Sequence, residues 1–277
     1  MTSDSKKKQD EAGRGRVLTA YETYNKLVET KVSDFEKVKE YLSETLEKLL
    51  ERKKIGLGVV LMSRIKAPES VVQNWKLGKN LNDIFGITLL TATDAEMKAI
   101  KETLRKSEMF NISSKKEKNE KRGYEAMHFL FNVGEETENK TKVECHLQTH
   151  DAYKSVYPHI FYKVRTRLNA EERKKEIESG KPPKPDRDLT PEEEEQIVEK
   201  IQEMYEEGSL IGEALSNGRS SRVPQMWVTS FNQNGKMEEQ YLEEEMILKI
   251  MYPFLDLSKK KTEAPNDGKK KNEEVEI

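Results

Sequence analysis

The apolar residues of this chain are gathered into short runs, and this grouping restricts the fold more than any other feature. Between residues 55 and 165, four such runs lie at 55–62, 86–92, 126–133 and 142–147. Their length and their bounding by charged or turn-forming residues are typical of buried strands. No run approaches about 18 apolar residues, so the sequence predicts no membrane-spanning helix.

The segments beside these runs have the spacing of helices. Residues 17–31 and 35–49 carry apolar side chains three and four positions apart, and a possible capping box, Ser33 to Glu36, lies between them. Further helices are predicted to begin near Pro68, after Thr93 and near Tyr153. Helices and strands in this order predict an α/β or α+β domain, with a mixed β-sheet flanked by helices.

Composition and charge narrow the class of protein. Charged residues make up 36% of the chain and apolar residues 34%, so we expect part of the chain to lie outside any core. The net charge of −2 gives no overall attraction to nucleic acid or membrane. Cys145 is the single cysteine, which excludes an internal disulfide, and the N-terminus lacks the apolar stretch of a secretory signal. We therefore predict a cytoplasmic protein with no membrane partner.

Composition also divides the chain into segments with different expected behaviour. The lysine- and glutamate-rich ends are expected to be disordered, and a Lys/Glu-rich stretch with Pro182, Pro183 and Pro185 is expected to be a linker. The predicted segments are a basic arm at 1–16, a folded domain at 17–169, a linker at 170–190, a helical C-terminal extension at 191–257 and a tail at 258–277. The apolar stretch of the extension is where we would expect a homo-oligomer contact.

Polar residues that can bind a ligand lie at the ends of the first two apolar runs. Arg64 and Lys66 follow the first run, and two cations at a strand end can hold a polyphosphate. Asp83 precedes Gly86 at the start of the second run, where a carboxylate suits Mg²⁺. The alternatives are a solvated strand end and a turn-capping aspartate.

Two further groups lie in the later runs. Arg122 and Tyr124 flank a glycine, so a ligand base could approach the backbone and stack on the tyrosine ring, with His128 four residues on. Glu144 interrupts the last apolar run. An acid in a buried strand is costly unless it is paired, protonated or bound to metal, so Glu144 either has such a partner or lies on a solvated face.

Taken together, these groups resemble the motifs of the RelA/SpoT-type (p)ppGpp synthetase domain, in order along residues 35–165. The matching segments are Arg64-Ile-Lys66 with Ser70, Asp83-Ile-Phe-Gly86, Gly123-Tyr124-Glu-Ala-Met-His128, Glu144-Cys-His-Leu-Gln-Thr149 and His159-Ile-Phe-Tyr162-Lys163. The resemblance implies a nucleotidyltransferase-like fold for residues 17–169. It also implies a pyrophosphokinase that moves the β,γ-pyrophosphate of ATP to the 3′-hydroxyl of GDP or GTP, making the alarmone (p)ppGpp.

The same resemblance implies roles for individual residues. Asp83 and Glu144 would be the catalytic residues and the ligands of Mg²⁺, with Glu144 a second ligand or the base for the 3′-hydroxyl. The residues implied to bind ATP are Arg64, Lys66, Ser70 and Lys76, and those implied to bind the acceptor are Arg122, Tyr124 and His128.

Three positions that are basic in the family pattern are neutral here: Asn74, Thr88 and Gln148. A fourth departure places His146 where the family has glutamine. These departures leave two alternatives open. One is a toxin-type member that pyrophosphorylates the 3′ end of tRNA, motivated by the lysine-rich stretch 114–122, which we expect to be a loop. The other is a catalytically dead relative that senses nucleotides or binds a partner.

Overall fold

The chain forms two compact units in the computed structural model. The first, the sheet unit, contains residues 1–156 and 218–243, and the second, the helical unit, contains residues 157–217 and 244–277. The structure describes residues 3–68, 71, 84–107, 110–119, 124–134, 140–154, 159–180, 182, 187–206 and 224–259. The chain therefore passes between the units three times, whereas the sequence analysis expected one domain followed by a linker and an extension.

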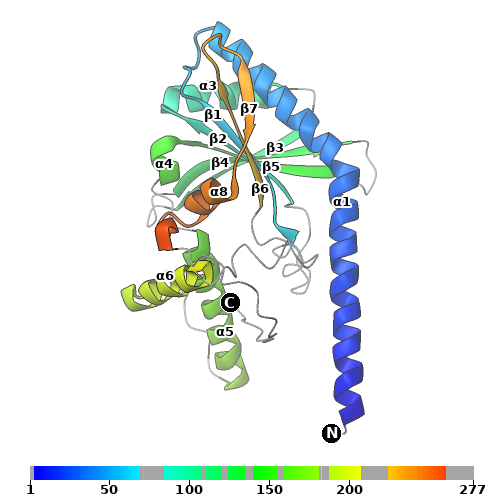
Figure 1. Cartoon of the computed structure of the whole chain (residues 1–277). Coiled ribbons are helices and arrows are strands. Elements are labelled where there is room, and N and C mark those ends of the chain that lie inside the picture. Colours follow the sequence, from blue (N-terminus) through cyan, green and yellow to red (C-terminus); the bar gives the residue numbers. More distant parts are fainter. Residues whose placement is uncertain are drawn as a thin grey trace. The chain divides into compact units, whose positions relative to one another are not determined.

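The N-terminal helix α1 (Ser3–Glu51) is continuous (Figure 1). It replaces both the disordered arm expected at 1–16 and the two helices expected to meet at Ser33. The arm contains three lysines and two arginines, residue types that favour a helix without needing apolar contacts. Ser33 therefore lies inside a helix and caps none, and the carboxylate of the neighbouring Asp34 accepts hydrogen bonds from the Thr141 hydroxyl at 2.8 Å and from Lys37 at 3.0 Å.

Seven strands form one mixed sheet in the order β3-β4-β5-β2-β1-β6-β7. Strands β2 and β5 are parallel, and the other neighbouring pairs are antiparallel. The strands are β1 (Val60–Ile65), β2 (Phe85–Thr91), β3 (Asn111–Asn119), β4 (Tyr124–Val133), β5 (Thr141–Thr149), β6 (Gln225–Phe231) and β7 (Met237–Tyr241). The mixed sheet and three of the four predicted strands are confirmed. The first strand begins later than predicted, because the chain turns at Gly56, whose carbonyl accepts from the Val59 amide.

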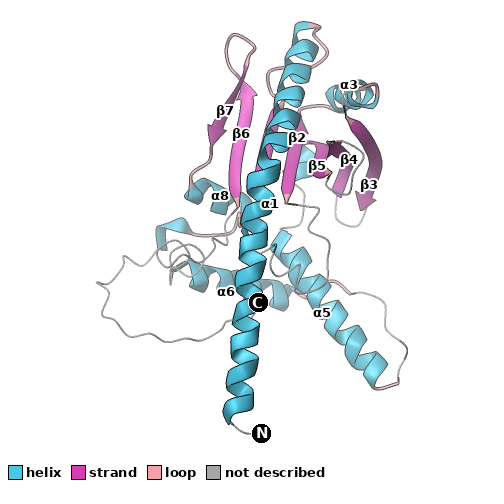
Figure 2. Cartoon of the chain, turned by 90° about the vertical axis from the view of Figure 1, so that its right-hand side faces the viewer, coloured by secondary structure: helices cyan, strands magenta, loops and turns pink. Residues whose placement is uncertain are grey.

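One face of the sheet is covered by α1 and by α3 (Asp94–Arg105), and Figure 2 shows α1 crossing in front of the strands. Phe35 of α1 stacks on Phe85 of β2 with ring centroids 4.9 Å apart. Along β5, buried and half-buried residues alternate from Thr141 to His146. This alternation follows from the two-residue period of a strand, and it leaves the second face less covered around its centre.

The lysine-rich stretch is not a loop through most of its length, because residues 111–119 form β3 at the edge of the sheet. This strand pairs with β4 over nine positions, from Asn111 opposite Asn132 to Asn119 opposite Tyr124. An edge strand needs only one hydrogen-bonded neighbour, and lysines are frequent on such edges. The apolar pattern alone therefore missed it.

The C-terminal extension is helical only in part, because β6 and β7 complete the sheet beside β1. Residues 225–230 of β6 pair antiparallel with 60–65 of β1. Lys39 of α1, 5% exposed, forms an ion pair with Glu239 of β7 at 2.6 Å and lies 4.9 Å from the Trp227 ring centroid. The last two strands are thus part of the same core as the N-terminal helix.

The helical unit contains α5 (His159–Glu178), α6 (Pro191–Glu206), α8 (Glu244–Met251) and a short 3₁₀ turn, η2 (Leu257–Lys259). The predicted helix start at Thr190 is confirmed, since its hydroxyl accepts from the Glu193 amide at 3.2 Å. Part of the predicted linker is helix, because α5 continues to Glu178. The short helix α4 (His150–Lys154) belongs to the sheet unit.

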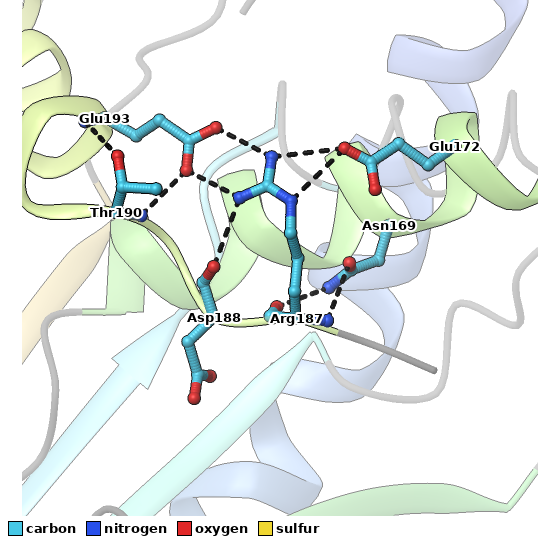
Figure 3. Close-up of polar contacts among 6 residues, drawn as sticks. All are labelled: Asn169, Glu172, Arg187, Asp188, Thr190 and Glu193. Atoms are coloured by element: carbon cyan, nitrogen blue, oxygen red, sulfur yellow. Dashed lines mark hydrogen bonds and ion pairs between the residues drawn. The ribbon is translucent and has the colours of Figure 1, made fainter. Parts of the chain in front are cut away.

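Arg187 joins the end of the α5–α6 connection to both helices (Figure 3). Its guanidinium donates to both oxygens of Glu193, at 2.7 and 2.8 Å, and to Glu172. Its backbone amide donates to the buried Asn169 side chain, and its carbonyl accepts from it.

Among the described residues, no helix is both long and apolar enough to cross a membrane.

Candidate functional site

The half-covered face of the sheet brings together motifs that lie far apart in the sequence. In one row across the sheet, Arg64 of β1 lies opposite Gly86 of β2, and Gly86 lies beside Glu144 of β5. Two residues further along the strands, His146 of β5 lies opposite His128 of β4. Because side chains two positions apart on a strand share a face, both rows lie on the face opposite the α1 core.

Glu144 is the centre of the polar contacts on this face. Its Oε1 lies 3.4 Å from Nδ1 of His128 and 3.3 Å from Nε2 of His146. The two imidazole rings lie beside each other, with centroids 4.0 Å apart and planes tilted by 35°. From the sequence, Glu144 either lies on a solvated face or has a partner. The structure shows both, since its side chain is 40% exposed and contacts two histidines.

The charge of Glu144 follows from these contacts. The imidazoles of His128, first, and of His146, whose nitrogens lie 3.4 and 3.3 Å from its Oε1, hold the pKa of the Glu144 carboxyl well below its usual range, and burial opposes this only in part. The carboxylate is therefore ionised at neutral pH. The neighbouring Cys145 faces the core, and burial raises the pKa of its thiol far above the usual value, so this cysteine is an inert packing residue.

Gly86 lets Arg64 lie over the middle of the row. A Cβ atom on Gly86 would meet Nε of Arg64 at 3.0 Å. The arginine side chain is half-buried, and its charge also reaches Tyr153 of α4, where it counteracts the rise in the phenol pKa that burial causes. A cation and an ionised carboxylate thus lie on either side of a glycine on one sheet face.

Lys66 follows β1 with its backbone held on both sides. Its amide donates to the Ile84 carbonyl at 2.8 Å, and its carbonyl accepts from the Tyr24 hydroxyl at 2.8 Å. Tyr24 comes from α1, and burial raises the pKa of its hydroxyl to about 12. The end of β1 is therefore fixed relative to α1, which supports a defined position for Arg64 and Lys66.

Several predicted site residues lie outside the part of the chain that the structure describes. These are Ser70, Lys76, Asp83 and Arg122, together with Asn74. The backbone of Tyr124 begins β4, but its side chain is also outside the description. The predicted residues that the structure brings to one face are Arg64, His128 and Glu144.

Three of the four positions that depart from the family motif, Thr88, His146 and Gln148, lie on the same face as the site. Thr88 lies beside His146 in the parallel β2–β5 pair, and Gln148 follows on the same side of β5. Gln148 is buried, and its Oε1 accepts no hydrogen bond from the described residues. The sequence analysis noted His146 only as a replaced glutamine. The two-residue spacing of Glu144 and His146 on a strand was the available signal that both share a face.

Comparison with solved structures finds small alarmone synthetases of low similarity. Small alarmone synthetase 1 from Bacillus subtilis bound to its product pppGpp is 15% identical, with a TM-score of 0.39 over 54% of this chain and 81% of that one. The same protein bound to AMPCPP is 16% identical, with a TM-score of 0.37 over 70% and 95%. A GTP pyrophosphokinase family protein from Streptococcus pneumoniae is 15% identical, with a TM-score of 0.36 over 54% and 78%. No protein-family model and no curated protein matches the sequence.

Proposed function

We propose that this chain is a pyrophosphokinase that transfers the β,γ-pyrophosphate of ATP to the 3′-hydroxyl of GDP or GTP, making (p)ppGpp. The observation that carries this proposal is the meeting of Arg64, Gly86, Glu144 and His128 on one face of the sheet. They come from four motifs that lie up to 80 positions apart in the sequence, so local structure alone would not bring them together. A cation for phosphate and a carboxylate for metal are the parts that phosphoryl transfer needs.

In this reaction the acceptor 3′-oxygen attacks the β-phosphorus of ATP, the bond from that phosphorus to the α–β bridging oxygen breaks, and AMP leaves. Arg64 and Lys66 would hold phosphate oxygens of ATP, Arg64 through two parallel hydrogen bonds. Glu144 would bind Mg²⁺ or take the proton of the hydroxyl, with Asp83 as the other ligand. The donor set fits this ion, because Mg²⁺ is usually held by one or two carboxylates together with the substrate's phosphates.

Tyr124 begins β4, and His128 lies further along the same strand. Because β4 pairs with the strand that carries Glu144, the acceptor would approach from this side of the sheet. We propose that Tyr124 stacks on the acceptor base and that His128 supports the pocket, with Arg122 as a further contact. Ser70 and Lys76 would complete the ATP site.

The test is a transfer assay with ATP labelled in its β and γ phosphates, in the presence of Mg²⁺. GDP, GTP, ATP and bulk tRNA are offered as separate acceptors. Arg64→Gln and Glu144→Gln should each lose transfer, whereas the control Arg105→Gln, on α3, should keep it. Label on GDP or GTP supports the proposal.

Two other results would each replace it. Label that moves only to tRNA, in a reaction that weakens steeply with salt, would establish the tRNA-directed alternative. No AMP release under any condition would favour the catalytically dead relative instead.

A further inference from the structure

The pair of histidines around Glu144 is more than the proposed transfer reaction requires. We propose that His128, Glu144 and His146 bind a divalent transition-metal ion of the zinc type, through two imidazole nitrogens and one carboxylate oxygen. One potential ligand atom from each residue lies within 4.8 Å of those from the other two.

The distances agree with a tetrahedral ion. In a zinc site the ligand atoms lie about 2.0–2.1 Å from the ion, so two of them are about 3.3–3.4 Å apart along an edge of the tetrahedron. The Oε1 atom of Glu144 is 3.3 Å from Nε2 of His146 and 3.4 Å from Nδ1 of His128. The two imidazole nitrogens lie within 4.8 Å of each other, so the third edge of the tetrahedron would close by movement of the two rings toward the ion.

The backbone holds the three residues in place before any ion arrives. His128 and His146 are directly opposite each other on antiparallel strands, and Glu144 is two positions from His146 on the same strand. All three come from the middle of β4 and β5 rather than from loops. Sites on regular elements keep their geometry better than sites on loops.

The ligand types favour a transition metal over Mg²⁺. Imidazole nitrogen suits zinc, copper, nickel and iron, whereas Mg²⁺ prefers oxygen ligands and keeps much of its water. Three protein ligands leave one tetrahedral position for water or substrate, as in catalytic zinc sites. The side chain of Glu144 is 40% exposed, and those of His128 and His146 are 17% and 29% exposed. The fourth coordination position would therefore face the less covered side of the sheet.

This site shares Glu144 with the proposed function but is defined without nucleotide. If the pyrophosphokinase proposal holds, the ion would lie beside the phosphate-binding Arg64 and could supply the metal of that reaction. If it fails, the ion site remains. A binding measurement in the absence of ATP therefore separates the two.

The experiment titrates the full chain, stripped of metal with a chelator, with Co²⁺ and follows its visible absorption spectrum and heat of binding. We expect one Co²⁺ per chain with the intense bands of a tetrahedral site, displaced by Zn²⁺ but not by a large excess of Mg²⁺. His146→Gln and Glu144→Gln should weaken binding by more than the roughly 10–100-fold that loss of an outer partner costs.

His150→Gln is the matched control, because this histidine lies in α4 and its Nε2 bonds the Gly58 carbonyl. It should bind Co²⁺ like the unchanged chain, and circular dichroism should show the same folded spectrum for all variants. Equal binding by the unchanged chain and His146→Gln would overturn the proposal. So would the loss of the bands in His150→Gln, or displacement of Co²⁺ by an equal concentration of Mg²⁺.

Discussion

Gly86 is the residue on which the position of Arg64 depends. With a methyl group on residue 86, Nε of Arg64 would lie 3.0 Å from it, closer than such contacts normally come. Since the crowded atom belongs to a flexible side chain, the arginine should turn away while the fold stays intact.

We therefore predict that Gly86→Ala weakens binding of a non-hydrolysable ATP analogue by about tenfold and changes the free energy of unfolding by less than about 1 kcal/mol. Calorimetry and thermal unfolding measure the two effects. Gly58→Ala is the control, because a Cβ there meets nothing within 4 Å. Equal nucleotide affinity in both variants would show that Arg64 does not bind phosphate in this way.

Single residues also show what the sequence could and could not predict about the site. Glu144 was identified because an acid in an apolar strand is costly without a partner. Its partners His128 and His146 are 16 residues or fewer from it along the chain, but their meeting depends on the register of two strands. A shift of one residue would place them on opposite faces, and the sequence does not fix that register.

At the scale of elements, Lys39 ties α1 to the last two strands. It is buried, and it pairs with Glu36 at 3.0 Å and with Glu239 at 2.6 Å, while its ammonium lies 4.9 Å from the ring centroid of Trp227 and 5.5 Å from that of Phe35. The two carboxylates are partly exposed, so water can solvate them if the lysine is removed. The loss from substitution therefore comes mainly from packing and from the charge–ring contacts.

Lys39→Ala should lower the free energy of unfolding by about 2–3 kcal/mol, and Lys39→Met should recover at least half of that loss by restoring the apolar stem. Chemical denaturation followed by tryptophan fluorescence measures both. Lys37→Ala, whose exposed side chain pairs with Asp34 on the same helix, should change the value by less than about 0.5 kcal/mol. A loss in Lys39→Met as large as in Lys39→Ala would mean that the ion pairs dominate instead.

The connection between α5 and α6 should respond to acid. The guanidinium of Arg187, together with the Thr190 amide, lowers the pKa of the Glu193 carboxyl from its usual 4.5 to about 2. A carboxyl whose pKa is lower in the folded state than in the unfolded state stabilises the fold at pH values above its unfolded pKa. This stabilisation is lost as the pH falls through the folded pKa. The contribution of Glu193 should therefore be complete above about pH 5 and disappear between about pH 4.5 and 2.

Hydrogen exchange of residues 187–206 should accordingly become faster as the pH is lowered through this range, after correction for the intrinsic rate. Because Arg187 is exposed and Glu193 is only partly buried, 1 M salt should reduce the effect. Arg187→Gln should remove most of the pH dependence, whereas Arg52→Gln should leave it unchanged. An unaltered profile in Arg187→Gln would contradict the assignment.

The elements also differ in how far the sequence predicted them. Strands β2, β4 and β5 were predicted within a few residues because their inward faces are continuous apolar rows. The edge strand β3 does not follow from the apolar pattern, because its nine residues contain three lysines and a single apolar residue, Ile112. Strands β6 and β7 lie in the extension that the sequence predicts to be helical, and the pairing of β6 with β1 is a contact across 160 residues or more that no local pattern encodes.

For the whole molecule, the order of the chain and the order of the sheet are different. The sequence predicts that the domain with the candidate site ends at residue 169, yet the sheet is completed by residues 225–241. Without them β1, which carries Arg64, would become an edge strand with its amides and carbonyls on one side unpaired. The proposed phosphate-binding residue thus depends on the far end of the chain.

A chain that ends at residue 217 should therefore lose protection from hydrogen exchange in β1 while β4 and β5 keep more of theirs, because their neighbours are still present. It should also aggregate more readily, since an edge with apolar residues such as Leu61 becomes available for pairing. A chain that ends at residue 259 is the control, because it keeps every strand and helix described, and its β1 exchange should match the full chain. Equal protection of β1 in the 217-residue and full-length chains would show that the last two strands are dispensable for the site.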